Sequence, residues 1–337
     1  MKYRSLGNTG LQISEIGFGC GDNAGLMVDG DDAERLQVVQ RALDRGINYF
    51  DTAGHYGGGR SETNLGATLK TLGARPIVAT KLRLRTEDLD DIPAAVRREF
   101  NASLQRLQME TVDLFYLHTR VAAERTFGAT GLNQLGIDDV SGPVWETFSR
   151  LRDEGRIRFL GICTSGAEVT AIRQVLATLP FDVIQAQYNI LNPTEALLPP
   201  GFQGSDHGQT IGQAADQGMG VVAYRALAAG ALAQRAGSAI RSSPSRGNAA
   251  WEADLERAEA LDFLRSETDE KLAGAAVRFV LGNSSVSSVL LGFSRLSYVD
   301  EANAYSEAGP LSTRQTERIE ALYTTDFGRV PMQQTGA

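Results

Sequence analysis

Short apolar runs alternate along this chain with longer segments of helical period. Eight of the runs have the length and composition of β-strands, and they span 15–19, 47–53, 77–81, 112–118, 158–164, 183–189, 221–226 and 287–293. Most are unbroken rather than alternating, which is typical of parallel strands covered on both faces. Between the first two, Leu36, Val39 and Leu43 are spaced as one helix face, and Gly46 supplies a stop.

Two further segments carry specific helix signals. Between the third and fourth runs, one apolar face begins at Ile92 and continues to Leu107, and Pro93 is tolerated in the first turn. After the fifth run, SGAE (165–168) has the spacing of a capping box, which predicts a helix that ends near Thr178, just before Pro180. Strand, cap and helix therefore form the repeating unit.

Eight such units predict an α/β fold of the (β/α)₈ TIM-barrel type, with residues 1–337 forming a single domain. The first 14 residues are expected to form a β-hairpin across the bottom, because GNTG is a turn signal between two short β-like runs. The alternative is a doubly wound open sheet. Against it, no GxGxxG leads from a strand into a helix, since Gly17, Gly19 and Gly21 have the wrong spacing.

Long irregular segments follow three of the predicted strands, at 119–141, 190–209 and 226–258. In a barrel they belong to the carboxyl-terminal face, and loops of this length are usually functional or mobile. Segments 23–29, 119–141 and 226–258 are expected to form the pocket walls. The last has a Ser/Gly/Arg-rich middle typical of a lid, in which Trp251 is either an aromatic ligand contact or a packing anchor.

Composition narrows the partners to small molecules. The formal net charge is −8 and no long basic block occurs, which argues against nucleic acid. No apolar run approaches the ~20 residues of a membrane span, and the first residues lack a signal or transit pattern, so a cytoplasmic location is expected. Two cysteines and three histidines, without an HExxH or HxH pair, predict neither disulfides nor a metal site. The oligomeric state cannot be read from this sequence.

Polar residues end three consecutive apolar runs. They are Asp51 in NYFDTA, Lys81 in IVATK and His118 in FYLH, and Tyr56 follows Asp51 on a glycine-rich turn. A barrel carries its active site at the carboxyl ends of its strands, so these side chains are expected to converge there. A nearby ammonium lowers the pKa of a phenol, and a carboxylate keeps a buried ammonium charged. The four groups then make a proton donor aimed at a carbonyl.

A purely structural interpretation has to be weighed against this. Asp51 and Lys81 can form a structural ion pair, Tyr56 can be an ordinary loop residue, and His118 can be a core histidine. The glycines of GGGR (57–60) either relieve a tight loop or let a ligand approach the backbone. Four ionisable groups at equivalent strand ends favour a catalytic site over a closed structural face.

The order FDTA, YGGGRSE, ATK and YLH strongly resembles the aldo-keto reductases, and the similarity runs from RSLGNTGLQIS to GFSRLSYVDEA. The resemblance implies NAD(P)(H)-linked interconversion of carbonyls and alcohols on a (β/α)₈ barrel. It implies Tyr56 as general acid, Lys81 as the group that modulates its pKa, Asp51 as the partner of Lys81 and His118 as the residue that orients the carbonyl.

The same resemblance implies a nicotinamide site. Gln185 matches the carboxamide-binding glutamine and Tyr224 the aromatic under the nicotinamide, while the usual Ser-Asn pair is replaced by Cys163 and Thr164. Thr164 is expected to contact the carboxamide, and Cys163 is either a rim contact or a buried, inert thiol. The full set of expected cofactor contacts is Gly19, Cys163, Thr164, Gln185, Tyr224, Arg225, Gly292, Ser294, Arg295 and Glu301.

The adenosine end departs from the family pattern. Ser294 stands where Arg or Lys is usual, and Ala302 follows Glu301 where Asn is usual, but Arg295 is adjacent and a helix start after GFS suits a phosphate. NADP(H) is therefore expected over NAD(H). Arg225 is either a pyrophosphate or substrate contact or a solvated rim charge. The expected activity is reduction of an aldehyde or ketone, or oxidation of a sugar-like hydroxyl. The alternative is a dinucleotide-sensing accessory protein with little turnover.

Overall fold

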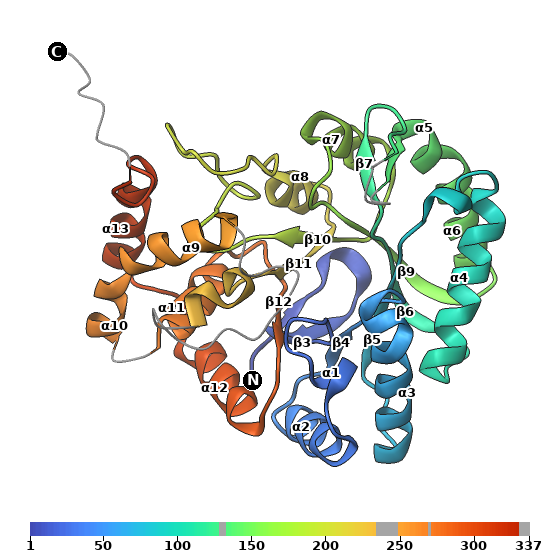
Figure 1. Cartoon of the computed structure of the whole chain (residues 1–337), viewed down its shortest axis with the longest axis horizontal. Coiled ribbons are helices and arrows are strands. Elements are labelled where there is room, and N and C mark those ends of the chain that lie inside the picture. Colours follow the sequence, from blue (N-terminus) through green and yellow to red (C-terminus); the bar gives the residue numbers. More distant parts are fainter. Residues whose placement is uncertain (128–132, 234–248, 269–270, 330–337) are drawn as a thin grey trace.

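The central feature of the computed structural model is a closed barrel of eight parallel strands with helices around it (Figure 1). The structure describes residues 1–127, 133–233, 249–268 and 271–329. The predicted (β/α)₈ fold is confirmed. The barrel strands are β3 (Ile16–Gly19), β4 (Tyr49–Asp51), β5 (Ile77–Leu82), β6 (Val112–Leu117), β9 (Ile157–Cys163), β10 (Val183–Gln187), β11 (Gly220–Tyr224) and β12 (Ser288–Gly292).

Strand register places the predicted functional positions at one end of this barrel. Around the ring the order is β10, β11, β12, β3, β4, β5, β6 and β9. Gly292 pairs with Gly19, and Gly19 in turn pairs with Asp51. Lys81 pairs with Tyr116. Because the strands are parallel, all their carboxyl ends open on the same face, which is where barrel enzymes hold their sites.

The predicted amino-terminal hairpin is confirmed. Strands β1 (Tyr3–Ser5) and β2 (Gln12–Ser14) pair antiparallel, and the short helix η1 (Gly7–Thr9) joins them. The Asn8 amide donates to the Gly218 carbonyl at 2.8 Å, just before β11 begins. A Cβ at Gly7 would lie 2.3 Å from the Gly220 nitrogen, so only glycine permits this contact. The hairpin therefore covers the amino-terminal end of the barrel, opposite the site.

Helices fill the intervals between strands. They are α1 (Leu26–Asp29), α2 (Asp32–Asp44), α3 (Arg60–Leu72), α4 (Ile92–Leu107), α5 (Ile137–Asp139), α6 (Trp145–Asp153), α7 (Val169–Thr178), α8 (Thr210–Asp216), α9 (Ala249–Glu259), α10 (Asp262–Thr268), α11 (Leu272–Gly282), α12 (Leu296–Ala308) and α13 (Thr313–Tyr323). Side chains cap two of them as sequence rules lead one to expect. Asp31 accepts from two amides of α2, and Asp91 accepts from Ala94 in α4, which has Pro93 in its first turn.

The capping box predicted at 165–168 is wrong. Helix α7 begins at Val169, and its N-cap Glu168 makes no side-chain cap hydrogen bond. The Glu168 carboxylate instead accepts from the Ala123 amide at 3.0 Å, and the Ser165 hydroxyl reaches Gln187 Oε1 at 3.5 Å. The Ser165 and Glu168 side chains therefore bond to groups on neighbouring segments instead of to the first amides of α7. The end of the helix at Thr178 is as predicted.

The long segments after the strands carry some structure of their own. Segment 119–141 holds the short parallel pair β7 (Arg120–Ala122) and β8 (Gln134–Gly136). Segment 226–258 contains η5 (Ala228–Ala233) and most of α9, and residues 234–248, on which the lid expectation falls, lie outside the described residues. Trp251 is 3% exposed and packs in a hydrophobic cluster with Leu261 and Leu264. This supports its reading as a packing anchor.

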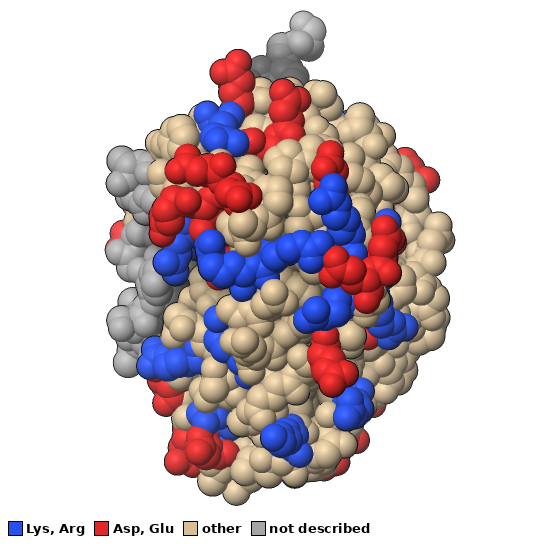
Figure 2. Space-filling model, turned by 90° about the vertical axis from the view of Figure 1, so that its right-hand side faces the viewer, with Lys and Arg blue, Asp and Glu red and all other residues tan. Residues whose placement is uncertain are grey.

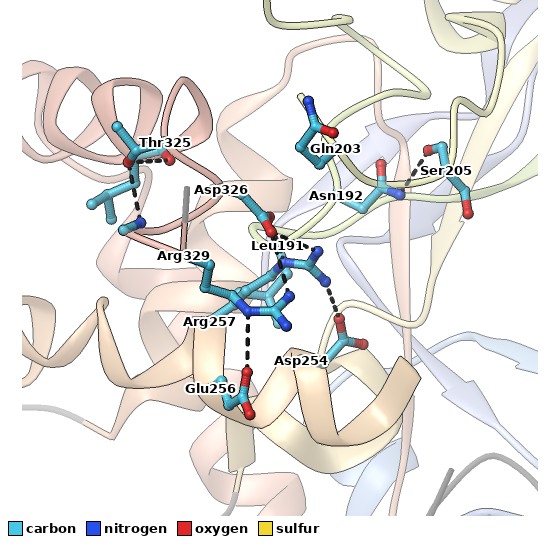
Figure 3. Close-up of polar contacts among 12 residues, drawn as sticks. Leu191, Asn192, Gln203, Ser205, Asp254, Glu256, Arg257, Thr325, Asp326 and Arg329 are labelled. Carbon is cyan, nitrogen blue, oxygen red and sulfur yellow. Dashed lines mark hydrogen bonds and ion pairs between the residues drawn. The ribbon is translucent and has the colours of Figure 1, made fainter. Parts of the chain in front are cut away.

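The last described turn is fastened to α9 by an ion-pair cluster (Figure 3). Arg257 donates to Asp326 through Nε at 2.8 Å and Nη2 at 3.3 Å, and it also pairs with Asp254 at 3.4 Å. Arg329 reaches Glu256 at 3.1 Å. Asp326 is 4% exposed, so its carboxylate depends on these donors for solvation. The cluster holds residues 326–329 near the segment after β10, where the Tyr323 hydroxyl donates to the Ile190 carbonyl at 3.0 Å.

The outer face formed around α4 and α6 mixes charges of both signs (Figure 2). Pairs such as Arg97 with Glu154 at 2.7 Å and Arg158 with Asp113 at 2.5 Å join neighbouring elements across this face. Across the described part of the chain, no helix combines the length and the apolar character that crossing a bilayer requires.

Candidate active site

Four polar residues predicted to act together lie in one cluster at the carboxyl end of the barrel. Asp51 ends β4, Lys81 lies in β5, His118 directly follows β6, and Tyr56 begins the short helix η2 (Tyr56–Gly59). Lys81 Nζ bonds Asp51 Oδ1 and lies 3.5 Å from the Tyr56 hydroxyl. The ring centroids of Tyr56 and His118 are 6.5 Å apart. The sequence-predicted tetrad is thus assembled in space.

The ion pair at the centre of the cluster is buried. Lys81 and Asp51 are each 3% exposed, and Lys81 Nζ also donates to the Thr52 carbonyl at 2.8 Å. Burial disfavours the ammonium, but the charges of Asp51 and Tyr56 outweigh it and raise the pKa of Lys81. Lys81 therefore stays cationic beneath the phenol, held by a carboxylate and a carbonyl.

The expected direction of the Tyr56 pKa shift is wrong for this structure. Burial raises the pKa of Tyr56 to about 12, and Lys81 opposes that shift without reversing it. Desolvation disfavours the phenolate more strongly than the nearby ammonium favours it, and the burial of Tyr56 cannot be read from the sequence. Tyr56 is therefore firmly protonated in the chain alone, and the cation beneath it reduces the cost of losing that proton.

A second histidine stands beside the predicted one. The rings of His55 and His118 are 4.9 Å apart between centroids, and the His55 ring meets that of Tyr56 at 4.7 Å. Burial, with the charges of Arg83 and Lys81, lowers the pKa of His55 to about 3, and burial and Lys81 lower that of His118 well below its usual value. Both rings are therefore neutral. Sequence reasoning missed His55, although its position next to Tyr56 was a signal.

Below the ion pair lies a polar layer that the sequence did not reveal. Gln185 Nε2 bonds Asp51 Oδ2, and the Tyr49 hydroxyl lies 3.5 Å from the same oxygen. The Tyr49 and Tyr116 hydroxyls are 3.2 Å apart, and all three side chains are buried. These donors fix the second Asp51 oxygen, so the carboxylate is held from both sides. In the sequence, Tyr49 and Tyr116 are indistinguishable from ordinary core aromatics.

The glycine-rich turn has a specific backbone requirement. Gly57, Gly58 and Gly59 have φ of 57°, 64° and 97°, a region that other residues rarely adopt. A Cβ at Gly57 would lie 2.5 Å from the Val28 side chain, and one at Gly59 would lie 2.7 Å from that of Arg106. These two glycines therefore pack against protein, and the conformational explanation of GGG is the one that the structure supports.

The residues expected at the nicotinamide lie at the ends of β9, β10 and β11. Gln185 uses its amide nitrogen on Asp51, and its oxygen lies 3.8 Å from Cys163 Sγ. Burial raises the pKa of the Cys163 thiol to about 12, so it is a buried, inert thiol. Thr164 donates to Glu195 at 2.6 Å. In this structure Gln185 and Thr164 are thus engaged with protein groups, and binding a carboxamide requires them to exchange partners. Their cofactor role stays a prediction.

Glu195 is a buried carboxylate that sequence reasoning missed. It is 0% exposed and accepts from the hydroxyls of Thr164 and Thr210. Burial raises its pKa to about 7, against the lowering effect of these two donors. A single acid among turn-like residues in NPTEALL gave no sequence signal of this role. It fixes the start of α8 against the end of β9.

Tyr224 ends β11 and Arg225 follows it, and their surroundings show whether this part of the barrel suits an anionic cofactor. Tyr224 is only partly buried. Arg225 has a left-handed φ of 58°, and its Nε is buried without a hydrogen-bond partner among the described residues. A solvated rim charge would not leave a donor buried, so that alternative is disfavoured. An orphaned guanidinium donor beside an accessible aromatic fits a dinucleotide pyrophosphate.

The adenosine end is formed at β12 and α12. Gly292 pairs with Gly19, Ser294 follows, and Arg295 is the N-cap of α12. The Arg295 guanidinium lies 5.0 Å from the Tyr298 ring centroid and makes no hydrogen bond or ion pair within the described residues. Glu301 is instead paired with Lys271 at 2.6 Å. Lys271 supplies a second cation near this end that the sequence analysis did not single out.

The chain matches a family of known proteins. The model of the Aldo/keto reductase family matches residues 15–324, so the chain belongs to this family and the resemblance seen in its motifs is confirmed. The class that barrel and tetrad define is therefore the aldo/keto reductases, oxidoreductases that use nicotinamide cofactors.

Individual relatives cover nearly the whole chain. It is 30% identical over 309 residues to L-galactose dehydrogenase of Arabidopsis thaliana, across 89% of this chain and 86% of that protein. A "Probable voltage-gated potassium channel subunit beta" of Oryza sativa subsp. japonica is 25% identical over 348 residues, 96% of each protein. The holo form of an aldo-keto reductase from Bacillus halodurans gives a TM-score of 0.72 at 26% identity, covering 99% of both chains.

Proposed function

We propose that this chain, as a single barrel domain, is an NAD(P)(H)-dependent oxidoreductase that interconverts a carbonyl and an alcohol, with Tyr56 as general acid and base. The observation that carries the proposal is the position of Lys81. Its Nζ lies 3.5 Å from the Tyr56 hydroxyl, and the same ammonium forms an ion pair with Asp51. A bound nicotinamide would supply or accept the hydride. Tyr56 would give its proton to the carbonyl oxygen in reduction and take it back in oxidation.

The surrounding residues support this division of roles. Lys81 offsets the negative charge that develops on the phenol oxygen, which is the charge a buried site otherwise disfavours. The neutral His118 ring has a buried Nδ1 without a hydrogen-bond partner in the described part of the chain, and we assign it to orient the substrate oxygen. Asp51 keeps Lys81 charged and fixed, and it is held in turn by Gln185 and Tyr49.

For the cofactor we propose NADP(H) rather than NAD(H). Within the described residues, the Arg295 guanidinium contacts the Tyr298 ring but makes no hydrogen bond or ion pair, and Lys271 lies close enough to pair with Glu301. Both cations suit a phosphorylated ribose, although Ser294 occupies the position where the family usually has a cation. For the substrate class, the likeness to L-galactose dehydrogenase favours a sugar-like alcohol or aldehyde.

The second candidate is a dinucleotide-sensing binding protein with little turnover. The likeness to the rice protein named as a potassium channel subunit favours it. An assembled tetrad favours the enzyme, because a sensor has no need of a proton donor supported by a buried ion pair.

The test is to screen aldehydes, ketones, quinones and aldoses with both cofactors and to follow the absorbance of the reduced nicotinamide. Rapid turnover with at least one pair supports the enzyme. Tight cofactor binding with negligible oxidation or reduction across the whole panel would establish the sensor instead.

A further inference from the structure

A small cavity adjoins His118 at the carboxyl end of the barrel, among residues that follow β5, β6 and β9. Its volume is about 120 Å³, and it is lined by Arg83, Leu84, His118, Thr119, Arg120, Asn133 and Ser165. Arg83 follows β5, and Arg120 begins β7 directly after β6. Within the described residues, no acidic side chain lines it. The cavity is therefore a cationic recess next to the group expected to orient the substrate oxygen.

Within the described residues, the two arginines have no counter-ion. Neither guanidinium makes a hydrogen bond or ion pair with any described residue, whereas most other described arginines do. Both residues are exposed, and partial burial of Arg83, followed by the charge of Arg120, lowers the pKa of Arg83. Two guanidinium groups without a nearby anion repel each other, and an anion that binds between them would relieve this repulsion. The planar, forked guanidinium groups suit the oxygens of a carboxylate or phosphate.

A buried amide gives an independent reason to expect a ligand. Asn133 is 3% exposed and lines the cavity, and its Nδ2 is buried with no hydrogen-bond partner among the residues that the structure describes. Its Oδ1 accepts from the Thr86 hydroxyl at 3.2 Å, which fixes the amide so that the nitrogen keeps this orientation. A buried donor without an acceptor is costly, and a ligand oxygen in the recess would satisfy it.

The anion that fits here is not the phosphate of a dinucleotide. In the ring of strands, β5 and β6 lie opposite β11 and β12, which carry Arg225, Ser294 and Arg295. His118 lines the recess itself. An anion bound to Arg83 and Arg120 would thus belong to the molecule whose oxygen faces His118.

We propose that Arg83, Arg120 and Asn133 form an anion subsite, so that the preferred substrate is a carbonyl or alcohol that also carries a carboxylate or phosphate group. This inference rests on the proposed oxidoreductase function. The shared chemistry is a group of two or three anionic oxygens, and carboxylate and phosphate are separated by the choice of probe.

The kinetic test uses matched pairs that differ in the anionic group. Butanal is compared with 4-oxobutanoate, and glyceraldehyde with glyceraldehyde 3-phosphate. We expect wild-type kcat/KM to favour at least one anionic member roughly tenfold or more, and Arg83→Met and Arg120→Met each to remove that preference while the neutral aldehydes are little affected. Arg85→Met is the control, because Arg85 is exposed as Arg83 and Arg120 are but pairs with Glu87 at 3.9 Å and does not line the recess.

A binding measurement separates failure of the subsite from failure of the enzyme. Calorimetric titration with 4-hydroxybutanoate and glycerol 3-phosphate, against butanol and glycerol, needs no turnover. If no aldehyde is reduced but an anionic alcohol binds wild type and loses at least tenfold in affinity in both variants, the subsite stands without the proposed function. Equal kcat/KM within each pair, or anion binding that survives both substitutions, would overturn the subsite.

Discussion

His55 and His118 lie side by side with ring centroids 4.9 Å apart and planes tilted by 50°, and both are neutral because burial and neighbouring cations lower their pKa values. In the unfolded chain each would titrate near a pKa of about 6.5. The unfolded state therefore binds more protons below that pH, and stability falls with falling pH through a window that for His55 extends down to about 3.

This gives a prediction for His55→Phe, which keeps an aromatic ring beside Tyr56. The variant should lose less free energy of unfolding between pH 7 and pH 4.5 than the wild type does, because one titrating group is removed from the unfolded state. Urea unfolding at the two pH values measures the difference. Identical pH slopes for the two proteins would show that His55 is protonated when folded.

Tyr56→Phe removes the proposed proton donor and leaves the turn intact. We expect carbonyl reduction to fall roughly 10²- to 10⁴-fold, the usual contribution of a general acid, while cofactor affinity changes little. The first readout is the stopped-flow or steady-state rate with the best substrate from the screen. The second is a fluorescence titration of cofactor binding. More than a tenth of the rate remaining would argue against this role.

Lys81→Met tests whether the buried pair serves chemistry or only structure. Alone, it leaves the buried Asp51 charge unpaired and should lower stability by about 3–5 kcal/mol. The double variant Lys81→Met/Asp51→Asn removes both charges and should recover most of that stability. We expect it to remain nearly inactive, because Tyr56 has lost its cation. Recovery of activity along with stability would make the pair purely structural.

Asp326→Asn breaks the fastening of the last described turn to α9. The hydrogen bonds from Arg257 to this 4% exposed carboxylate, at 2.8 Å and 3.3 Å, are weakened, so we expect a loss of about 2 kcal/mol in the free energy of unfolding. Asp254→Asn is the matched control, since its bond to Arg257 is longer, 3.4 Å, and its effect should be smaller. Equal losses in urea titrations would mean that the geometry of the pair does not matter.

Ser294→Arg restores a cation where the family usually has one. The ratio of NADP(H) to NAD(H) affinity should rise about tenfold, because a guanidinium adds a charge-assisted contact to a ribose phosphate. Ser284→Arg adds the same charge at the opposite end of β12 and should leave the ratio unchanged. If both variants shift it alike, the effect is one of net charge and 294 does not lie at the ribose.

The barrel could be predicted because its strands are unbroken apolar runs, and the tetrad because each run ends in a polar residue. Local patterns failed where tertiary partners intervened. Ser165 and Glu168 have the spacing of a cap, yet Gln187 and the Ala123 amide engage them. The Tyr56 pKa required knowledge of burial, which sequence does not supply.

Other parts of the site had no sequence signal of their own. Tyr49 and Tyr116 are apolar in pattern, and only the structure brings their hydroxyls together beneath Asp51. Arg83 and Arg120 lie 37 positions apart, and their meeting at one recess depends on the pairing of β5 with β6. The order of residues in the sequence does not tell which side chains on neighbouring strands come into contact.

The backbone of residues 57–59, left-handed at three successive positions, has a consequence for diversification of this protein. The platform that carries the phenol tolerates almost no change of amino acid, so selection for a new substrate has little room there. Libraries built to redirect specificity should leave that stretch and His118 untouched and sample residues 119–127 after β6 and 196–205 after β10.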